Sequence, residues 1–118
     1  MRMRIYFLIP VATIVTCLST FAMAQGANPS GQDLAMNLNK GNCLACHAIP
    51  GDPKAVTSAN IGPPLIAMKA RFPDKAKLRA QIWDATQNNP NTSMPPFGKH
   101  KVLTEGEIDL ITDYVYGL

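Results

Sequence analysis

The sequence lacks the patterns that mark sheet-based and repetitive folds. No segment alternates strictly between polar and apolar residues, as a half-buried strand would, and no stretch recurs at a fixed interval. The chain has 118 residues, the size of one domain. A single all-α domain is therefore the expected fold.

The sequence also lacks a large excess of positive charge. Its 11 basic and 8 acidic residues give a formal net charge of +3. Without Arg2 and Arg4, which lie in a segment that we expect to be removed, nine basic residues face eight acidic ones and the net charge is +1. The basic residues are not interleaved with aromatic side chains, so nothing indicates binding to nucleic acid.

Residues 1–24 have the composition of a secretory signal peptide. Arg2 and Arg4 form a positive start, residues 5–21 form an apolar stretch, and residues 22–24 (AMA) form a small-x-small cleavage site. The apolar stretch is interrupted by proline and falls near the lower end of the roughly 17 to 25 residues that a membrane-spanning helix needs. We expect cleavage and export to the periplasm, with no membrane anchor afterwards.

Cysteine is scarce, with three residues in the whole chain. Cys17 lies inside the expected signal peptide, and Thr16 precedes it where a lipidated cysteine would follow Gly, Ala or Ser. We therefore expect Cys17 to leave with the signal. The exported compartment is oxidising, so Cys43 and Cys46 should be paired, metallated or modified.

After a polar lead-in over residues 25–30, the domain over residues 31–118 is expected to contain four short helices. The first is expected at residues 31–40 after the N-cap Ser30, with Leu34 and Leu38 on one face, the second within residues 61–72, and the third over residues 75–86 after the N-cap Asp74. The fourth is expected to begin at Thr104, which forms a capping box with Glu107, and to carry Ile108, Ile111 and Val115 on one side. The connections over residues 48–60 and 88–101 are long, and such loops are usually functional or disordered. A large bound apolar group would add core to this small chain and give the loops a surface to cover.

Cys43, Cys46 and His47 form a C-x-x-C-H run, the spacing of covalent haem attachment. Two other interpretations are possible. A zinc site could use these three residues with His100, but the adjacent Cys46 and His47 would have to bind one small ion. A redox dithiol would be expected at the junction of a strand and a helix, and no strand is expected.

A haem iron also needs a second axial ligand unless that position stays open. Met36 lies on the helix that leads into the motif, so it cannot easily reach the opposite face of the haem. Met68 has helical spacing to Leu65, which is typical of a core residue. Met94 lies in the irregular stretch NTSMPPFG, where no helix face requires an apolar side chain. Met94 is therefore favoured, with His100 as the fallback. The turn over residues 62–65 (GPPL) could hold a backbone carbonyl for the His47 ring, or could simply start a helix.

Four runs in order, GNCLACH, NIGPPL, SMPPFG and LTEGEI, resemble class I cytochromes c with His/Met ligation. The finer resemblance is to the SoxX family, the SoxX subunits of SoxAX sulfur-oxidation cytochromes, and it covers nearly all of residues 31–118. It implies a small class I cytochrome c fold around one covalently bound haem c. Cys43 and Cys46 would be the thioether attachments, His47 and Met94 the axial ligands, and Pro63 the source of the carbonyl bonded to the His47 ring.

The same resemblance implies a complex with a SoxA-like haem subunit that oxidatively attaches thiosulfate to a cysteine of a carrier protein. This chain would be the non-catalytic, electron-accepting subunit of such an L-cysteine S-thiosulfotransferase, passing electrons to a downstream acceptor such as another cytochrome c. Sulfur transfer needs a nucleophilic thiolate, and none remains once Cys43 and Cys46 hold haem. A free-standing class I cytochrome c serving another periplasmic partner is the alternative.

The segment from residue 69 to residue 79 carries five basic side chains, Lys69, Arg71, Lys75, Lys77 and Arg79. They could bind an acidic partner, or they could form an ordinary solvated helix face. The sequence leaves both interpretations open, and the first predicts that Lys75→Glu and Lys77→Glu slow electron transfer at low salt.

Overall fold

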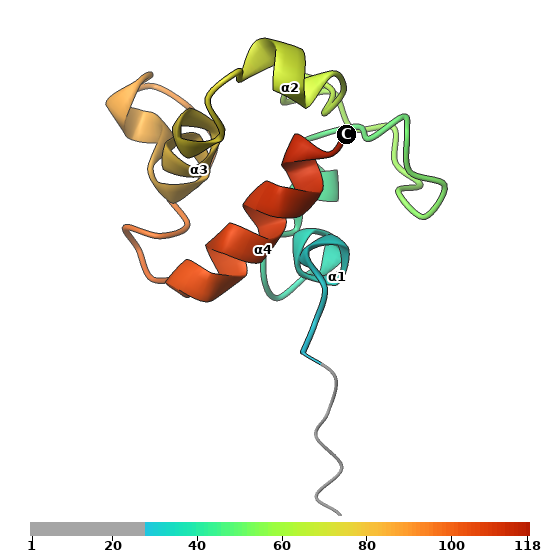
Figure 1. Ribbon diagram of the computed structural model, residues 1–118, viewed down its shortest axis with the longest axis horizontal. Coiled ribbons are helices and arrows are strands. Elements are labelled where there is room, and N and C mark those ends of the chain that lie inside the picture. Colours follow the sequence, from blue (N-terminus) through green and yellow to red (C-terminus); the bar gives the residue numbers. More distant parts are fainter. Residues whose placement is uncertain (1–27) are drawn as a thin grey trace, which may run out of the picture.

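The computed structural model describes residues 28–118, so the predicted signal peptide lies outside the described residues. The described part contains helices and turns and no strand, as expected (Figure 1). In chain order its elements are α1 (Gly31–Met36), the 3₁₀ turn η1 (Cys43–Ala45), α2 (Met68–Arg71), α3 (Lys75–Trp83), the 3₁₀ turn η2 (Ala85–Gln87) and α4 (Glu105–Tyr116).

Helix α4 is the longest element, and α1, α2 and α3 all pack against it (Figure 1). It starts where the sequence indicates, because Thr104 and Glu107 form the predicted capping box. Glu107 also pairs with Lys40, Nζ to Oε1 at 2.7 Å, and so joins the start of α4 to the segment after α1. The buried face of α4 carries Ile108, Ile111 and Val115, the residues that the helical spacing predicted.

The crossing of α1 and α4 depends on the absence of a side chain at Gly31. A Cβ atom added there would lie 2.0 Å from the carbonyl oxygen of Leu110 and 3.0 Å from the Cβ atom of Tyr114. The first turn of α1 therefore rests directly on the backbone of α4.

We expect Gly31→Ala to destabilise the fold by about 1–3 kcal/mol, the usual cost of overpacking, because the two helices must move apart. Gly106→Ala is the matched control. Gly106 lies in α4, the other helix of this pair, and a Cβ atom there would meet nothing within 4 Å. Urea unfolding of both variants measures the difference. Equal midpoints for the two variants would show that the close crossing does not matter.

Two of the expected helices are shorter in the structure than the sequence indicated. The first ends at Met36 because Asn37 has extended backbone angles, and Leu38 is consequently 79% exposed instead of sharing the buried face with Leu34. The third stops before Asp84, whose side chain accepts the Thr86 N–H and begins a separate turn. The second is confirmed as a brief helix, α2, within residues 61–72.

The predicted loop over residues 48–60 is held to the helices by one buried carboxylate. The Tyr114 hydroxyl of α4 donates to Asp52 Oδ2 at 2.6 Å, and the backbone N–H of Lys54 donates to Asp52 Oδ1 at 2.9 Å. Gln32 of α1 also donates to Asp52 Oδ2. The hydrogen bond from Tyr114 is the main cause that lowers the pKa of Asp52 below its usual range. The long loop is therefore an ordered part of the domain.

Candidate functional site

One cavity of about 820 Å³ occupies the interior of the domain. That volume lies within the roughly 300–1,000 Å³ of typical ligand sites. Its walls come from the segment after α1, from α2, α3 and α4, and from the loop that contains Met94. The apolar side chains in the wall include Leu65, Met68, Ile82, Phe97, Ile111 and Val115. The space suits a large, mainly apolar group.

Cys43, Cys46 and His47 all line this cavity. Asn42 takes a left-handed conformation with φ of 44°, and the chain then turns so that the His47 N–H donates to the Cys43 carbonyl at 2.8 Å. The two cysteines are not joined by a disulfide. Burial raises the pKa of the Cys43 thiol to about 11, so the thiol is protonated at neutral pH.

The GPPL turn lies directly beside the His47 ring. Pro63 O accepts a hydrogen bond from His47 Nδ1 at 2.6 Å, which leaves Nε2 without that proton and able to bind a metal. The Gly62 N–H donates to Cys46 O at 2.8 Å, and the Leu65 N–H donates to Ala48 O at 2.8 Å. The turn and the C-x-x-C-H motif are thus joined by backbone hydrogen bonds.

Gly62 brings the backbone into contact with the imidazole. A Cβ atom at this position would lie 2.3 Å from His47 Cε1 and 2.6 Å from Nδ1. Gly62 was indicated in the sequence only as part of a turn, because contact with a ring fifteen residues away leaves no local signal. Together with Pro63 it sets the orientation of the His47 ring.

Among the four candidates for a second axial ligand, Met94 and Met68 line the cavity. Met68 is buried and its sulfur accepts a hydrogen bond from Arg71 Nη1 at 3.3 Å, as suits a core residue. Met94 is only partly buried and belongs to an irregular stretch, where its N–H donates to Thr92 Oγ1 at 3.1 Å. Met36 and His100 are not part of the cavity wall.

The donor set therefore fits haem better than zinc or a dithiol. Two thiols and an oriented imidazole border an apolar cavity, and a thioether lies in another part of its wall. Within residues 28–118, no cluster of three or more His, Cys, Asp and Glu side chains could hold a metal ion. His100, the fourth ligand of the zinc hypothesis, is exposed and outside the cavity wall.

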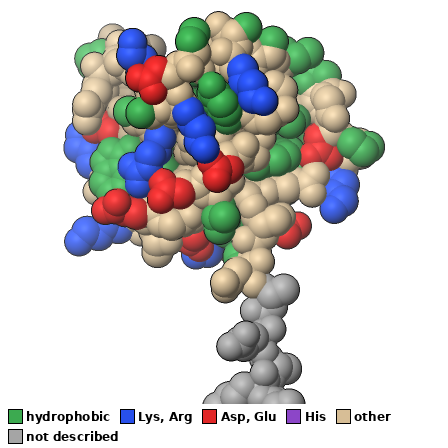
Figure 2. Space-filling model, in the orientation of Figure 1, with side chains coloured by type: hydrophobic (Ala, Val, Ile, Leu, Met, Phe, Trp, Pro, Cys, Tyr) green, Lys and Arg blue, Asp and Glu red, His purple; other side chains and the backbone are tan. Residues whose placement is uncertain are grey.

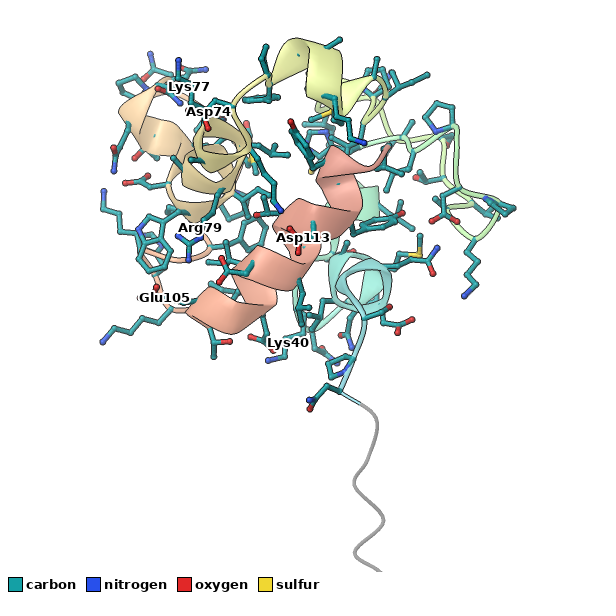
Figure 3. All side chains as sticks on the ribbon, in the orientation of Figure 1. Lys40, Asp74, Lys77, Arg79, Glu105 and Asp113 are labelled. Atoms are coloured by element: carbon teal, nitrogen blue, oxygen red, sulfur yellow. The ribbon has the colours of Figure 1, made fainter. Side chains whose placement is uncertain are left out.

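The basic run of residues 69–79 is partly paired within the domain. Arg79 Nε lies 2.5 Å from Asp109 Oδ1 of α4, and Lys75 pairs with Asp113. Figure 3 shows Arg79 on the side of α3 toward Glu105, and Figure 2 shows basic and acidic side chains mixed over this face. The ion pairs of Lys75 and Arg79 thus join α3 to α4. This pairing favours the interpretation of the basic run as a solvated helix face over its interpretation as a docking surface.

The fold and the cavity together define a cytochrome c domain. Residues 27–115 match the family described as cytochrome c oxidase, cbb3-type, subunit III, and the chain belongs to this family. Membership implies a haem c cofactor, for which the cavity provides the residues described above.

The chain is also similar to individual proteins. An uncharacterized lipoprotein of Aquifex aeolicus (strain VF5) is 36% identical over 77 residues, which are 65% of this chain and only 36% of that protein's length. The crystal structure of SoxXA from P. pantotrophus superposes with a TM-score of 0.65 at 23% identity, covering 76% of this chain and 82% of that one. The second similarity shows a shared fold.

None of the helices within residues 28–118 has the length and apolar character required to cross a membrane.

Proposed function

We propose that this chain is a monohaem c-type cytochrome that transfers single electrons. Cys43 and Cys46 would hold one haem c through thioether bonds, and His47 and Met94 would bind its iron. The observation that carries the proposal is the pairing of the C-x-x-C-H motif with an oriented His47 ring at the wall of an apolar cavity. When bound, the haem supplies a one-electron Fe(III)/Fe(II) couple.

The protein residues set the properties of that couple. The Pro63 carbonyl fixes the ring orientation and the tautomer of His47 and increases its basicity. A thioether such as that of Met94 favours the ferrous state and raises the reduction potential relative to a second imidazole. The apolar wall excludes water, which also favours the less charged reduced state.

We further propose that the chain is the electron-accepting, SoxX-like subunit of a periplasmic SoxAX-type complex that attaches thiosulfate to a carrier-protein cysteine. The runs GNCLACH, NIGPPL and MPPFG support this assignment, and the fold similarity to SoxXA is consistent with it. Because both cysteines of the domain are committed to haem, the sulfur chemistry belongs to the SoxA-like partner. Electrons then pass to a downstream acceptor such as another cytochrome c.

The opening of the cavity offers a surface for such a partner. Leu38 and Ile61 line the cavity and are nevertheless 79% and 70% exposed. Val102 is a third exposed apolar residue of the cavity wall. Close approach here would shorten the path for electron transfer and would bury the three apolar side chains.

We expect Ile61→Glu to weaken binding to a SoxA-like subunit by roughly tenfold or more, because a charge would be buried in an apolar contact. Val56→Glu is the matched control, since Val56 is 89% exposed and does not line the cavity. Affinity is measured by co-purification and titration of the haem-loaded proteins. Equal affinities for the two variants would place the contact elsewhere.

The proposed function is tested by purifying the exported protein from its native host. A pyridine haemochrome spectrum and a mass increase of one haem that survives denaturation are expected, because thioether bonds are covalent. Co-purification with a second haem subunit and thiosulfate-dependent reduction support the SoxX-like role, whereas a lone cytochrome supports the free carrier. The same mass spectrum identifies the mature N-terminus, at Gln25 if the signal is cleaved as expected or at a lipid-modified Cys17 if it is not.

A further inference from the structure

Asp84 is a buried carboxylate at the break between α3 and η2. It is 2% exposed. Its Oδ1 atom accepts hydrogen bonds from the N–H and the hydroxyl of Thr86, and its Oδ2 atom lies 3.1 Å from Lys99 Nζ and 3.5 Å from Gln87 Nε2. These hydrogen bonds, led by that from Thr86, hold the pKa of Asp84 at about 2. The carboxylate is therefore ionised at neutral pH and available to Lys99.

Lys99 belongs to the loop that carries Met94, and three polar contacts attach that loop to the end of α3. The Gly98 N–H donates to Trp83 O at 3.1 Å, and the Lys99 N–H donates to the same oxygen at 3.3 Å. The Lys99 side chain reaches Asp84. Gly98 also packs on the indole, since a Cβ atom there would lie 2.1 Å from Trp83 Cε3.

The chain between this attachment and Met94 is short and stiff. Pro95 and Pro96 restrict the backbone, and Phe97 is buried in the core. The Phe97 carbonyl accepts hydrogen bonds from the N–H groups of Val102 and Leu103 at 2.9 Å and 3.2 Å. The two prolines, the buried Phe97 ring and the attachments at Gly98 and Lys99 therefore fix the chain that follows Met94.

We propose that Asp84 is a positioning residue for Met94. By holding Lys99 at the end of α3, its carboxylate keeps the loop against the cavity, so that Met94 stays in the cavity wall where its sulfur would bind the haem iron. Neither Asp84 nor Lys99 lines the cavity, so the effect is transmitted through the loop and not through contact with haem. The inference rests on the proposed function, in which Met94 binds the iron.

The test uses the oxidised haem-loaded protein and imidazole as a competing ligand. Asp84→Asn removes the charge that holds Lys99, so the loop should open more often and imidazole should displace Met94 at roughly tenfold lower concentration. The readout is the loss of the weak near-infrared sulfur-to-iron band during the titration. An unchanged midpoint in folded Asp84→Asn protein would overturn the proposal.

Asp113→Asn is the matched control, because it removes one carboxylate charge and one ion pair, with Lys75, away from the Met94 loop. Its imidazole midpoint should equal that of the unaltered protein. If Asp84→Asn fails to fold, Lys99→Gln breaks the same pair from its exposed side and should show the same shift, while Lys99→Arg should restore the original midpoint. A normal midpoint for Lys99→Gln would also overturn the proposal.

The failure of this inference differs from the failure of the proposed function. If Met94 is not a ligand, the sulfur-to-iron band is absent from the unaltered protein or persists in Met94→Leu. If Met94→Leu eliminates the band and neither Asp84→Asn nor Lys99→Gln changes the response of the band to imidazole, Met94 is the ligand and Asp84 does not position it.

Discussion

Gly62→Ala is expected to abolish normal haem ligation by His47. The new methyl group would lie 2.3 Å from His47 Cε1, so either the ring or the GPPL turn must move. Movement of the ring breaks its hydrogen bond to Pro63 O, and movement of the turn breaks the backbone bond from Gly62 to Cys46. In both cases the imidazole loses the orientation that iron binding needs. Visible spectra of the purified protein should show little or no low-spin haem, and the yield of holoprotein should fall.

Gly51→Ala is the control for this substitution. Gly51 lies in the neighbouring loop, and a Cβ atom there would meet nothing within 4 Å. Its spectrum and yield should equal those of the unaltered protein. A normal low-spin spectrum from Gly62→Ala would mean that the contact between glycine and imidazole does not govern ligation.

Met94→Leu is expected to eliminate the near-infrared sulfur-to-iron band of the oxidised protein and to lower its reduction potential. Leucine fills a similar volume but has no sulfur, so the iron loses a soft ligand that stabilises its ferrous state. Near-infrared absorption and a redox titration measure the two effects.

Met68→Leu is the matched control, because Met68 also lines the cavity and its sulfur is already hydrogen-bonded to Arg71. The band should survive in this variant, with at most a small loss of stability. Persistence of the band in Met94→Leu, or its disappearance in Met68→Leu, would reverse the assignment of the ligand.

Local sequence signals predicted the helix starts well and the helix ends poorly. Ser30, Asp74 and Thr104 are N-caps as expected, because a capping side chain bonds to backbone two or three residues away. The end of α1 at Met36 and the break at Asp84 were missed, because side chains there bond to nearby backbone in place of the helix. Asn37 Oδ1 accepts the N–H of Asn39, and Asp84 Oδ1 accepts the N–H of Thr86. Leu38 consequently lies on the cavity wall and not on the helix face.

The ion pairs of α3 also could not be predicted from the sequence. Arg79 and Lys75 appeared as part of one basic run, but their partners Asp109 and Asp113 lie on α4, at least thirty residues later. The two helices must pack before the charges meet. Of the two interpretations that the sequence left open, the ion pairs favour a helix face held to α4 over a docking surface.

The sequence by itself determined the class of the protein and predicted the chemistry of its site, because the C-x-x-C-H spacing, the capping residues and the Met94 loop are local patterns. Only the tertiary structure decided how the site is oriented and held. The contact of Gly62 with His47, the crossing of Gly31 over α4 and the attachment of Lys99 to Asp84 join residues that are 15 or more positions apart. Such contacts depend on where the folded backbone passes, and no local spacing encodes them.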